Sequence, residues 1–441
     1  MEDSKSEPES KPNGNNDRAF DEKTGNHTLD WLLEGADMGD LQAQVGIVLR
    51  AIAIVCNCVA GCVIGALCWV LVRPFSRAAS RRLVGAWSQA TWAAATLSVF
   101  PSTRLVLSGE LPNPAAPGVL IANHQMDTDW LYLWEVARAV GAHGNVKVVL
   151  LGDIANVPVM GWGIRLFEFV LLDRYNKADA TRQIADAARS FAADGVPALF
   201  ILFPEGTVIC DRMLAKSKSF ARGRGRPAFE RLLSPRVAGL HAAVAAFRAA
   251  GVEPLVYDAT VAYSSYTGEV PTWEMGYGRE TDTDIPNLVK LLKGRAGESV
   301  HVHCAPFAAA DVLPPDGGDA ATLEGWLDER WREKEALLGA FASEGAFPSS
   351  RVGPTHALRP PRRPMAVAAC LVIAAWSVGA TLLPLVLLLC ALVPLLLLGL
   401  CCCSPAIACA GACALAARSL PSAVATPAAA VDEASEPLKG D

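Results

Sequence analysis

The sequence has few cysteines outside its apolar stretches and no excess of positive charge. Of its 13 cysteines, only Cys210 and Cys304 lie between two long apolar stretches, and neither belongs to a C-x-x-C pair. We therefore expect no disulfide scaffold and no metal site, as is typical of a reducing compartment. The formal net charge of -6 excludes the overall basic field of nucleic-acid-binding proteins, so no nucleic-acid partner is expected.

The two ends of the chain also lack the signals of processed or folded segments. Residues 1–28 mix acids with Lys, Ser, Pro and Asn, without an early apolar core or an Arg-rich, acid-poor composition. This pattern favours a disordered acidic leader over a signal peptide or a transit peptide. Residues 418–441, rich in Ala, Pro and acids, are expected to form a disordered tail.

Charge is absent from two stretches that are long enough to cross a bilayer. We assign an N-terminal membrane region to residues 46–101 with a span at about 51–72, because roughly 20 apolar residues of helix cross a bilayer core of about 30 Å. Residues 365–417 carry no charge and contain prolines, which predicts a C-terminal transmembrane hairpin. A linker rich in Pro and Arg, residues 346–364, precedes this hairpin.

The side of the membrane on which the body lies depends on the charges around the first span and on residues 83–101. Arginines follow the span from Arg73 onward, whereas acids dominate before it, so the positive-inside rule places the following residues in the cytosol. Residues 83–101 are less apolar, and Ser88 and Gln89 favour an interfacial or re-entrant helix over a span. A full crossing there would move the body to the other side.

The body, residues 102–345, alternates short apolar runs with helical patterns, which predicts an α/β domain. We expect strands at residues 119–122, 148–151, 199–203, 255–263 and 300–303. Residues 184–191 carry apolar side chains at helical spacing, and Gly195 ends this predicted helix.

His124 and Asp129 follow the first of these strands as an H-x4-D pair. Positions i and i+5 of one continuous helix lie about 140° apart, so we expect His124 at the strand-to-helix turn and Asp129 in the first helical turn. A carboxylate there can hold one imidazole nitrogen while the other faces substrate, as in a general base with its orienting acid. Asp127 competes for the orienting role, and the spacing alone leaves both acids, and a simple capping role for His124, open.

Residues 203–207, Phe-Pro-Glu-Gly-Thr, close the very apolar strand predicted at 199–203. Glu205 and Gly206 would then stand at the carboxyl end of a strand, where open α/β sheets bind ligands. A plain turn is the alternative, because Pro and Gly mark turns in many loops.

Together these blocks resemble the glycerolipid acyltransferase family, which includes the 1-acylglycerol-3-phosphate acyltransferases. The resemblance rests on four blocks in order, namely Asn123 to Trp130, Leu172 to Arg174, Phe203 to Thr207 and Tyr257 to Tyr263. Features at residues 219–236, 301–303 and 326–335 resemble the eukaryotic subgroup of lysophosphatidate, lysocardiolipin and lysophosphatidylinositol acyltransferases.

The resemblance implies the glycerol-phosphate acyltransferase fold, a mixed sheet flanked by helices, in an integral protein of the endoplasmic-reticulum membrane. It implies acyl transfer from acyl-CoA to the sn-2 hydroxyl of 1-acyl-sn-glycerol 3-phosphate without a cofactor. Lysocardiolipin and lysophosphatidylinositol are alternative acceptors that fit the same residues. The implied catalytic pair is His124 and Asp129, and the implied substrate-binding residues are Arg174, Glu205, Gly206 and Thr207.

Two sequence features and two other functions offer alternatives to this interpretation. The basic run at residues 222–226 could attract CoA phosphates or anionic headgroups, although a solvated loop fits it as well. His301 and His303 share a strand face, but without a third ligand a core strand is favoured over a metal site. A catalytically silent lipid-binding protein is the alternative of another class, and the presence of His124 and Glu205 argues against it. No G-x-S-x-G elbow supports an esterase.

Overall fold

The structure is a computed structural model, and it describes residues 41–89, 103–157, 159–173, 176–264, 266–270, 297–314 and 320–358 with a few single positions beyond. The chain divides into two compact units, residues 1–381 and 382–441, of which the first is described below. The predicted leader and tail, and nearly all of the predicted hairpin at 365–417, lie outside the described residues.

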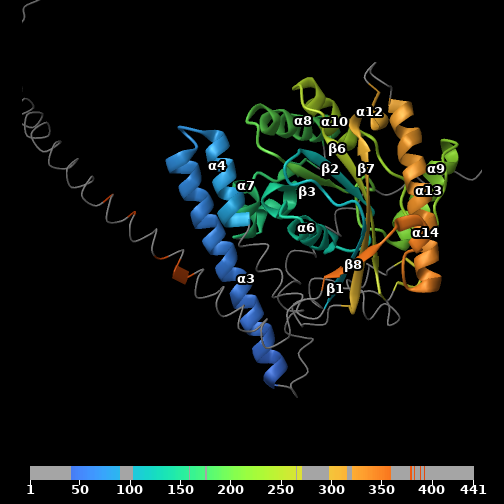
Figure 1. The fold of residues 1–441 in the computed structure, drawn as a ribbon, viewed down its shortest axis with the longest axis horizontal. Coiled ribbons are helices and arrows are strands. Elements are labelled where there is room, and N and C mark those ends of the chain that lie inside the picture. The colour runs from blue at the N-terminus through green and yellow to red at the C-terminus, as the bar shows by residue number, and fades with distance from the viewer. Residues whose placement is uncertain are drawn as a thin grey trace, which may run out of the picture. The chain divides into compact units, whose positions relative to one another are not determined.

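The centre of the first unit is an eight-stranded sheet with the strand order β4-β3-β5-β2-β6-β7-β1-β8 (Figure 1). Its strands are β1 Arg104–Gly109, β2 Gly118–Ala122, β3 Val146–Leu151, β4 Val170–Leu172, β5 Leu199–Leu202, β6 Leu255–Tyr263, β7 Ser299–Ala308 and β8 Thr355–Leu358. β2 lies parallel to β5 and β6, whereas β6 pairs antiparallel with β7. The predicted α/β class with a mixed sheet is therefore confirmed, and all of the predicted strands are present.

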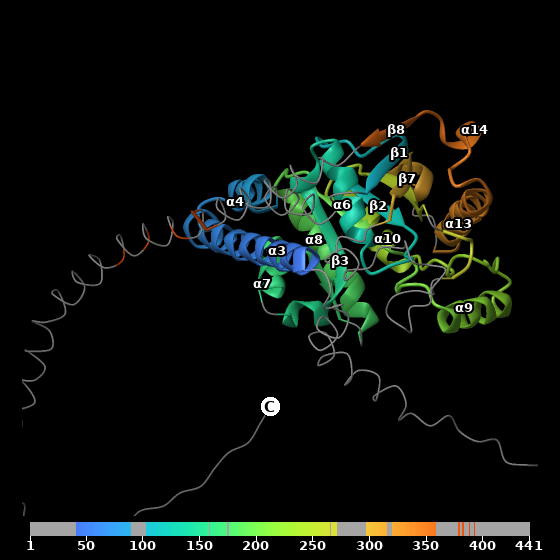
Figure 2. The same ribbon diagram turned by 90° about the horizontal axis from the view of Figure 1, so that it is seen from below.

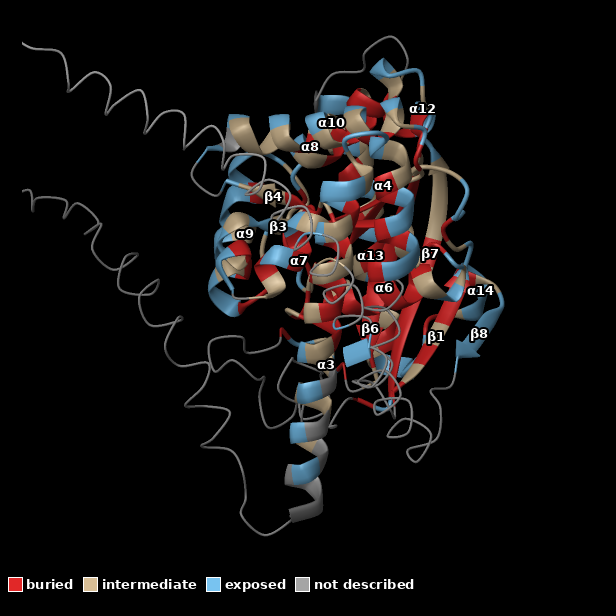
Figure 3. Cartoon of the chain, turned by 90° about the vertical axis from the view of Figure 1, so that its left-hand side faces the viewer, coloured by how far each residue is buried: buried red, intermediate tan, exposed pale blue. Residues whose placement is uncertain are grey.

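The sheet extends past residue 345, where we expected the domain to end. The predicted linker at 346–364 contains the short helix α14, Ser349–Val352, and strand β8, which pairs antiparallel with β1. All residues of β8 are exposed, as the pale colour in Figure 3 shows. The sequence of β8 has no run of apolar residues that would predict a strand, because β8 joins the sheet through backbone pairing with β1 and buries none of its side chains.

Helices cover both faces of the sheet. They are α6 Asp129–Ala139, α7 Met160–Leu166, α8 Lys177–Ala193, α9 Asp211–Gly223, α10 Ala238–Ala249, α12 Ala309–Val312 and α13 Ala320–Glu344, with 3-10 turns η3 His143–Asn145 and η4 Gly152–Asn156. Leu120 of β2 packs into a core with α6, and its neighbour Ile121 packs into a second core with α8, α10 and α13. Alternate residues of one strand thus serve two buried layers, which explains why β2 is a continuous apolar run.

The helix α3, Leu41–Leu67, continues as the π-helical turn η1, Cys68–Val72. Within the part of the chain that the structure describes, Arg50–Val72 is the one helix with the length and composition to cross a membrane. Its C-terminal half packs on α7, since a Cβ added to Gly65 would lie 3.1 Å from Leu166. In Figures 1 and 2 the sheet lies between α3 and α7 on one side and α13 on the other.

The segment after α3 is tied to the domain by ion pairs. Helix α4, Arg77–Leu83, is followed by the π-helical turn η2, Val84–Gln89. The buried guanidinium of Arg81 lies 2.8 Å from Glu168 and 2.7 Å from Asp194. Gln89 donates to the carbonyl of Val146 at 2.8 Å and accepts from the Lys147 amine at 2.9 Å. The described part of the segment 83–101 therefore packs on the domain.

Candidate functional site

The turn between β2 and α6 carries His124 at the carboxyl end of the central strand. Asn123 fixes this turn, because its amide donates to the carbonyl of Val261 at 3.0 Å and accepts from the same residue's N–H at 2.8 Å. Helix α6 then begins at Asp129. The strand-to-helix turn that the H-x4-D spacing predicts is thus present.

The imidazole of His124 is held by Asp129. Its Nδ1 lies 2.9 Å from Oδ2 of Asp129, which also accepts the backbone N–H groups of Gln125 at 2.7 Å and Met126 at 2.9 Å. A carboxylate acceptor places the proton on Nδ1, so Nε2 keeps its lone pair. The ring stacks on Phe203 with centroids 4.0 Å apart. The Asp129 side chain is fully buried, whereas 16% of the His124 side chain is exposed. Nδ1 is thus bound to Asp129, and part of the His124 side chain remains exposed.

The second oxygen of Asp129 is bound by a tyrosine from another strand. The hydroxyl of Tyr263, at the end of β6, donates to Oδ1 of Asp129. Burial, and then the nearby Asp129 charge, raise the pKa of the Tyr263 hydroxyl well above its usual range, so the hydroxyl stays protonated as a donor. Both carboxylate oxygens of Asp129 are therefore satisfied inside the protein.

Asp127, the rival orienting acid, does not contact the imidazole. Burial, and then the charge of Asp129, raise its pKa to about 6. Among the described residues, its buried Oδ1 has no hydrogen-bond partner. The geometry thus assigns the contact with His124 to Asp129, and Asp127 is a buried acid beside the pair.

Glu205 lies beneath the site rather than facing solvent. Its Oε1 accepts the N–H of His124 at 3.4 Å and its Oε2 accepts the N–H of Leu233 at 3.3 Å. Burial raises the pKa of this carboxyl well above its usual range, although these two hydrogen bonds work in the other direction. Glu205 therefore braces the backbone of the turn that carries His124, and its expected contact with substrate stays a prediction.

The loop after β5 also joins the catalytic turn through its backbone. The N–H of Ile209 donates to the carbonyl of His124 at 3.0 Å. Gly206 is exposed and has a φ of +75°, a conformation that favours glycine, and Thr207 beside it is half-buried. Arg174, which the resemblance assigns to the acceptor phosphate, lies outside the described residues.

The acid of the fourth block lies in an internal ion pair. Asp258 lies 2.6 Å from the amine of Lys334, and both side chains are almost completely buried. Lys334 also donates to the carbonyl of Ala259. This block therefore contributes Tyr263 to the site, whereas Asp258 fastens α13 to β6.

The basic run at 222–226 and the histidines of β7 make contacts inside the protein. Arg226 pairs with Asp328 at 2.7 Å, so the basic run at 222–226 is partly used inside the protein. His301 packs edge-on against Phe341, and burial and then Arg104 lower the pKa of His301 to about 4. Within the described ranges, no group of at least three His, Cys, Asp or Glu side chains could hold a metal ion.

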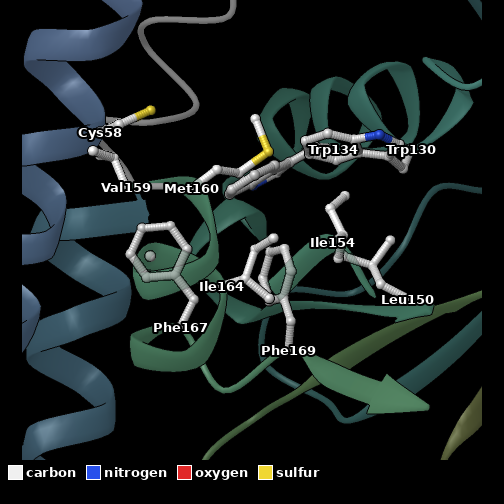
Figure 4. A pocket seen from close by; sticks show the side chains of 11 residues that line it. Cys58, Trp130, Trp134, Leu150, Ile154, Val159, Met160, Ile164, Phe167 and Phe169 are labelled. Carbon is white, nitrogen blue, oxygen red and sulfur yellow. The ribbon is translucent and has the colours of Figure 1, made fainter. Parts of the chain in front are cut away.

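An apolar pocket lies beside helix α6 (Figure 4). It is lined by Cys58, Trp130, Trp134, Leu150, Ile154, Val159, Met160, Gly163, Ile164, Phe167 and Phe169. Trp130 directly follows Asp129 in α6, and Cys58 belongs to α3, so the pocket connects the catalytic helix with the apolar helix. Such a lining suits an alkyl chain.

Two features of the site escaped sequence reasoning. The role of Tyr263 depends on the register of β6, in which Ala259 pairs with Ala122, so that Tyr263 continues past the end of β2. Most of the pocket lining comes from residues 150–169. The helices there are short, so their sequences show no clear helical pattern. The register argument could have identified Tyr263 once β2 and β6 were placed side by side.

Comparisons with known proteins find similarity to acyltransferases. Residues 104–231 match the family model described as Acyltransferase. The chain is 29% identical over 291 residues to the probable 1-acyl-sn-glycerol-3-phosphate acyltransferase 5 of Arabidopsis thaliana, covering 65% of this chain and 70% of that protein. It is 30% identical over 261 residues to lysocardiolipin acyltransferase 1 of Danio rerio, covering 59% of this chain and 61% of that protein. The crystal structure of the 1-acyl-sn-glycerophosphate acyltransferase PlsC from Thermotoga maritima aligns with a TM-score of 0.37 and 18% identity over 67% of this chain and 99% of that chain.

Proposed function

Because residues 104–231 form an acyltransferase-family domain, we propose that this chain transfers a fatty acyl group from acyl-CoA to the sn-2 hydroxyl of 1-acyl-sn-glycerol 3-phosphate, giving phosphatidate. The observation that carries the proposal is the His124–Asp129 pair, in which Nδ1 is held at 2.9 Å and Nε2 remains available. We propose a membrane of the endoplasmic reticulum as the location, with the domain in the cytosol and α3 in the bilayer.

The chemistry follows from the tautomer of His124. Nε2 accepts the proton of the sn-2 hydroxyl while the hydroxyl oxygen attacks the thioester carbonyl. The same nitrogen then gives this proton to the leaving CoA sulfur. Asp129 stabilises the imidazolium between these two steps. The new ester bond replaces the thioester bond, so no cofactor and no covalent acyl-enzyme are needed. General-base help of this kind contributes about 10²- to 10⁴-fold.

Positioning supplies the remaining rate enhancement in this proposal. Glu205 fixes the backbone of His124, and Tyr263 fixes Asp129, so neither needs to touch the substrate. Gly206 and Thr207 border the exposed side of the loop after β5, where an acceptor could approach. Arg174 remains our proposed ligand of the acceptor phosphate.

The apolar pocket supports a lipid substrate. Its wall includes Trp130, which follows Asp129 in helix α6, and Phe167 near α3. Burying apolar surface stabilises a bound chain by about 0.8 kcal/mol for each CH₂ group. We therefore propose that these apolar side chains contact an acyl chain of one of the substrates.

A second acceptor is supported by the similarity to lysocardiolipin acyltransferase 1 of Danio rerio. Lysocardiolipin and lysophosphatidylinositol carry the same glycerol hydroxyl and a phosphodiester, so the proposed chemistry is unchanged. A catalytically silent lipid-binding role is the alternative of another class, and it predicts binding without turnover.

The function is tested with membranes that contain the full chain, labelled acyl-CoA and three acceptors: lysophosphatidate, lysocardiolipin and lysophosphatidylinositol. We expect the wild type to acylate lysophosphatidate fastest, and His124→Ala to lose at least about 100-fold of that rate. His356→Ala is the matched control, because His356 is exposed in the edge strand β8, and it should keep the wild-type rate.

The outcomes separate the candidates. Faster acylation of lysocardiolipin or lysophosphatidylinositol would show that the preferred acceptor is not lysophosphatidate, whereas the proposed mechanism would still hold. Equal rates for wild type and His124→Ala would refute the catalytic assignment. Lipid binding without acylation of any acceptor would favour the silent protein.

A further inference from the structure

Residues 233–236 lie beside the loop that carries Glu205 and Gly206, and hydrogen bonds hold them in place. The N–H of Arg236 donates to the carbonyl of Pro204 at 2.9 Å, and the N–H of Ser234 donates to the hydroxyl of Ser217 at 2.7 Å. With the bond from Leu233 to Glu205, the segment is held at three successive points. The backbone of Arg236 therefore has a defined place beside the catalytic turn.

The guanidinium of Arg236 covers Gly206. A Cβ added to Gly206 would lie 3.1 Å from both Cζ and Nη1 of Arg236. Any side chain at residue 206 would press on this group, so the missing Cβ lets the guanidinium lie against the loop backbone. Arg236 and Gly206 are both exposed, which places a cation at the open edge of the site, next to the residue that braces His124.

The charge of Arg236 is not neutralised within the described part of the chain. Three other arginines of this part of the chain are paired: Arg226 with Asp328 at 2.7 Å, Arg231 with Glu335 at 2.9 Å and Arg248 with Glu253 at 3.0 Å. Arg236 has no ion pair or side-chain hydrogen bond with any residue that the structure describes. Glu205 is unavailable as a partner, since both of its oxygens accept backbone N–H groups.

We propose that Arg236 binds a phosphate group of a substrate, an inference that rests on the proposed acyl transfer. An arginine presents a planar fork of donors that matches phosphate oxygens, and it is always charged. The phosphate is that of the lysophospholipid headgroup or one of those of acyl-CoA, and both substrates must meet at His124. Arg236 would thus orient one of them from the side of the loop after β5.

The test measures binding without turnover. The full chain in detergent is unfolded thermally in the presence of lysophosphatidate, of a monoacylglycerol with the same chain, or of acyl-CoA, because a ligand that binds the folded state raises the unfolding midpoint. We expect Arg236→Gln to weaken the apparent affinity for lysophosphatidate by roughly 10- to 100-fold and Arg236→Lys to weaken it less. The affinity for the phosphate-free monoacylglycerol should stay unchanged.

The control is Arg332→Gln, which removes an exposed arginine of α13 that pairs with Glu329 at 2.7 Å and should alter neither affinity. A loss confined to acyl-CoA would assign Arg236 to the donor phosphates. Unchanged affinities for both phosphate compounds, or no stabilisation of the wild type by either, would overturn the proposal.

Kinetics separate this proposal from the proposed function. Arg236→Gln should raise the KM for one phosphate-bearing substrate by a similar factor. An unchanged KM for both, in a chain that acylates lysophosphatidate, overturns the role of Arg236 alone. Phosphate-dependent binding through Arg236 without any acylation overturns the proposed function alone.

Discussion

Asp127 and Asp129 are neighbours in one turn, yet their surroundings differ. Asp129 accepts hydrogen bonds at both oxygens, from His124 at one and from Tyr263 at the other. Asp127 is buried with one oxygen unpaired among the described residues, and its pKa is raised from 3.8 to about 6. The same side-chain chemistry thus holds His124 at one position and resists ionisation at the other.

Replacing Asp127 with Asn tests this difference through the pH dependence of stability. A raised pKa means that the folded chain binds the proton more tightly, so the stability contributed by Asp127 is complete below about pH 4 and is lost as the pH rises through about 6. The shift from 3.8 to about 6 corresponds to about 3 kcal/mol. Asp127→Asn should keep this stability at pH 7, which thermal unfolding at several pH values measures.

Asp186→Asn serves as the control for this experiment, because Asp186 is an exposed residue of α8 and its variant should follow the wild-type pH curve. Parallel curves for wild type and Asp127→Asn would contradict the prediction. Since Asp129 holds Nδ1 of His124, Asp127→Asn should also retain most of the acyltransferase rate.

Among the elements, α4 joins the apolar helix to the domain through buried charge. The hydrogen bonds from Arg77, despite some burial, lower the pKa of Asp194. Burial acts against ionisation of Glu168 as well, but the hydrogen bonds from Arg81 and Arg73 hold its pKa below the usual range. Stability from these pairs is therefore present above about pH 4 and is lost as the pH falls through the lowered pKa values.

Arg81→Gln should destabilise the protein strongly. The Arg81 side chain is 5% exposed and bonds to Glu168, Asp194 and the carbonyl of Ser190, so its loss leaves two carboxylates poorly compensated. Removing one partner of a buried pair costs about 3–5 kcal/mol. Thermal unfolding of the full chain at pH 7 measures the cost.

The matched control is Arg82→Gln at the next position. Arg82 is exposed, and its guanidinium donates to the carbonyl of Gly195 at 3.2 Å, so the change should cost less than about 1 kcal/mol. Equal losses of stability in the two variants would show that α4 is not anchored through Arg81.

The elements differ in how far their sequences predicted them. β2 and β5 are buried on both faces, and their continuous apolar runs predict strands; β6 is predicted as well, although Asp258 and Thr260 interrupt its apolar residues. β8 is wholly exposed and β4 is very short, so neither has a side-chain pattern that marks a strand. The hydrogen bond from Tyr263 to Asp129 joins residues 134 positions apart, and such contacts follow from strand register rather than from local sequence.

At the scale of the whole molecule, exposed apolar side chains gather on the elements before the domain and on α7. They include Val48, Ile52 and Val55 of α3, Val70 and Leu71 of η1, Phe75, Trp87 of η2 and Trp162 of α7. Large apolar surfaces of this kind mark contact with a membrane or a partner. We therefore expect this side of the domain to face a bilayer, with α3 as the proposed span.

The topology follows from contacts on both sides of the segment 83–101. Residues 73–89 bond to the domain at Glu168 and Val146, and the described chain resumes in the domain at residue 103. The intervening residues 90–102 would span about 20 Å as a helix, which is too short to cross a bilayer core of about 30 Å. We therefore propose a single crossing by α3, and the arginines that follow it predict a cytosolic domain.

A protease-cleavable tag inserted after Glu110, in the exposed loop that follows β1, tests this topology. In sealed microsomes with the cytosolic face outward, we expect protease to cleave this tag and to leave a tag at the N-terminus intact until detergent opens the vesicles. A resident lumenal protein that stays intact before detergent shows that the vesicles are closed. Protection of the tag after Glu110 would mean that the chain crosses the bilayer a second time before the domain, and the cytosolic assignment would fall.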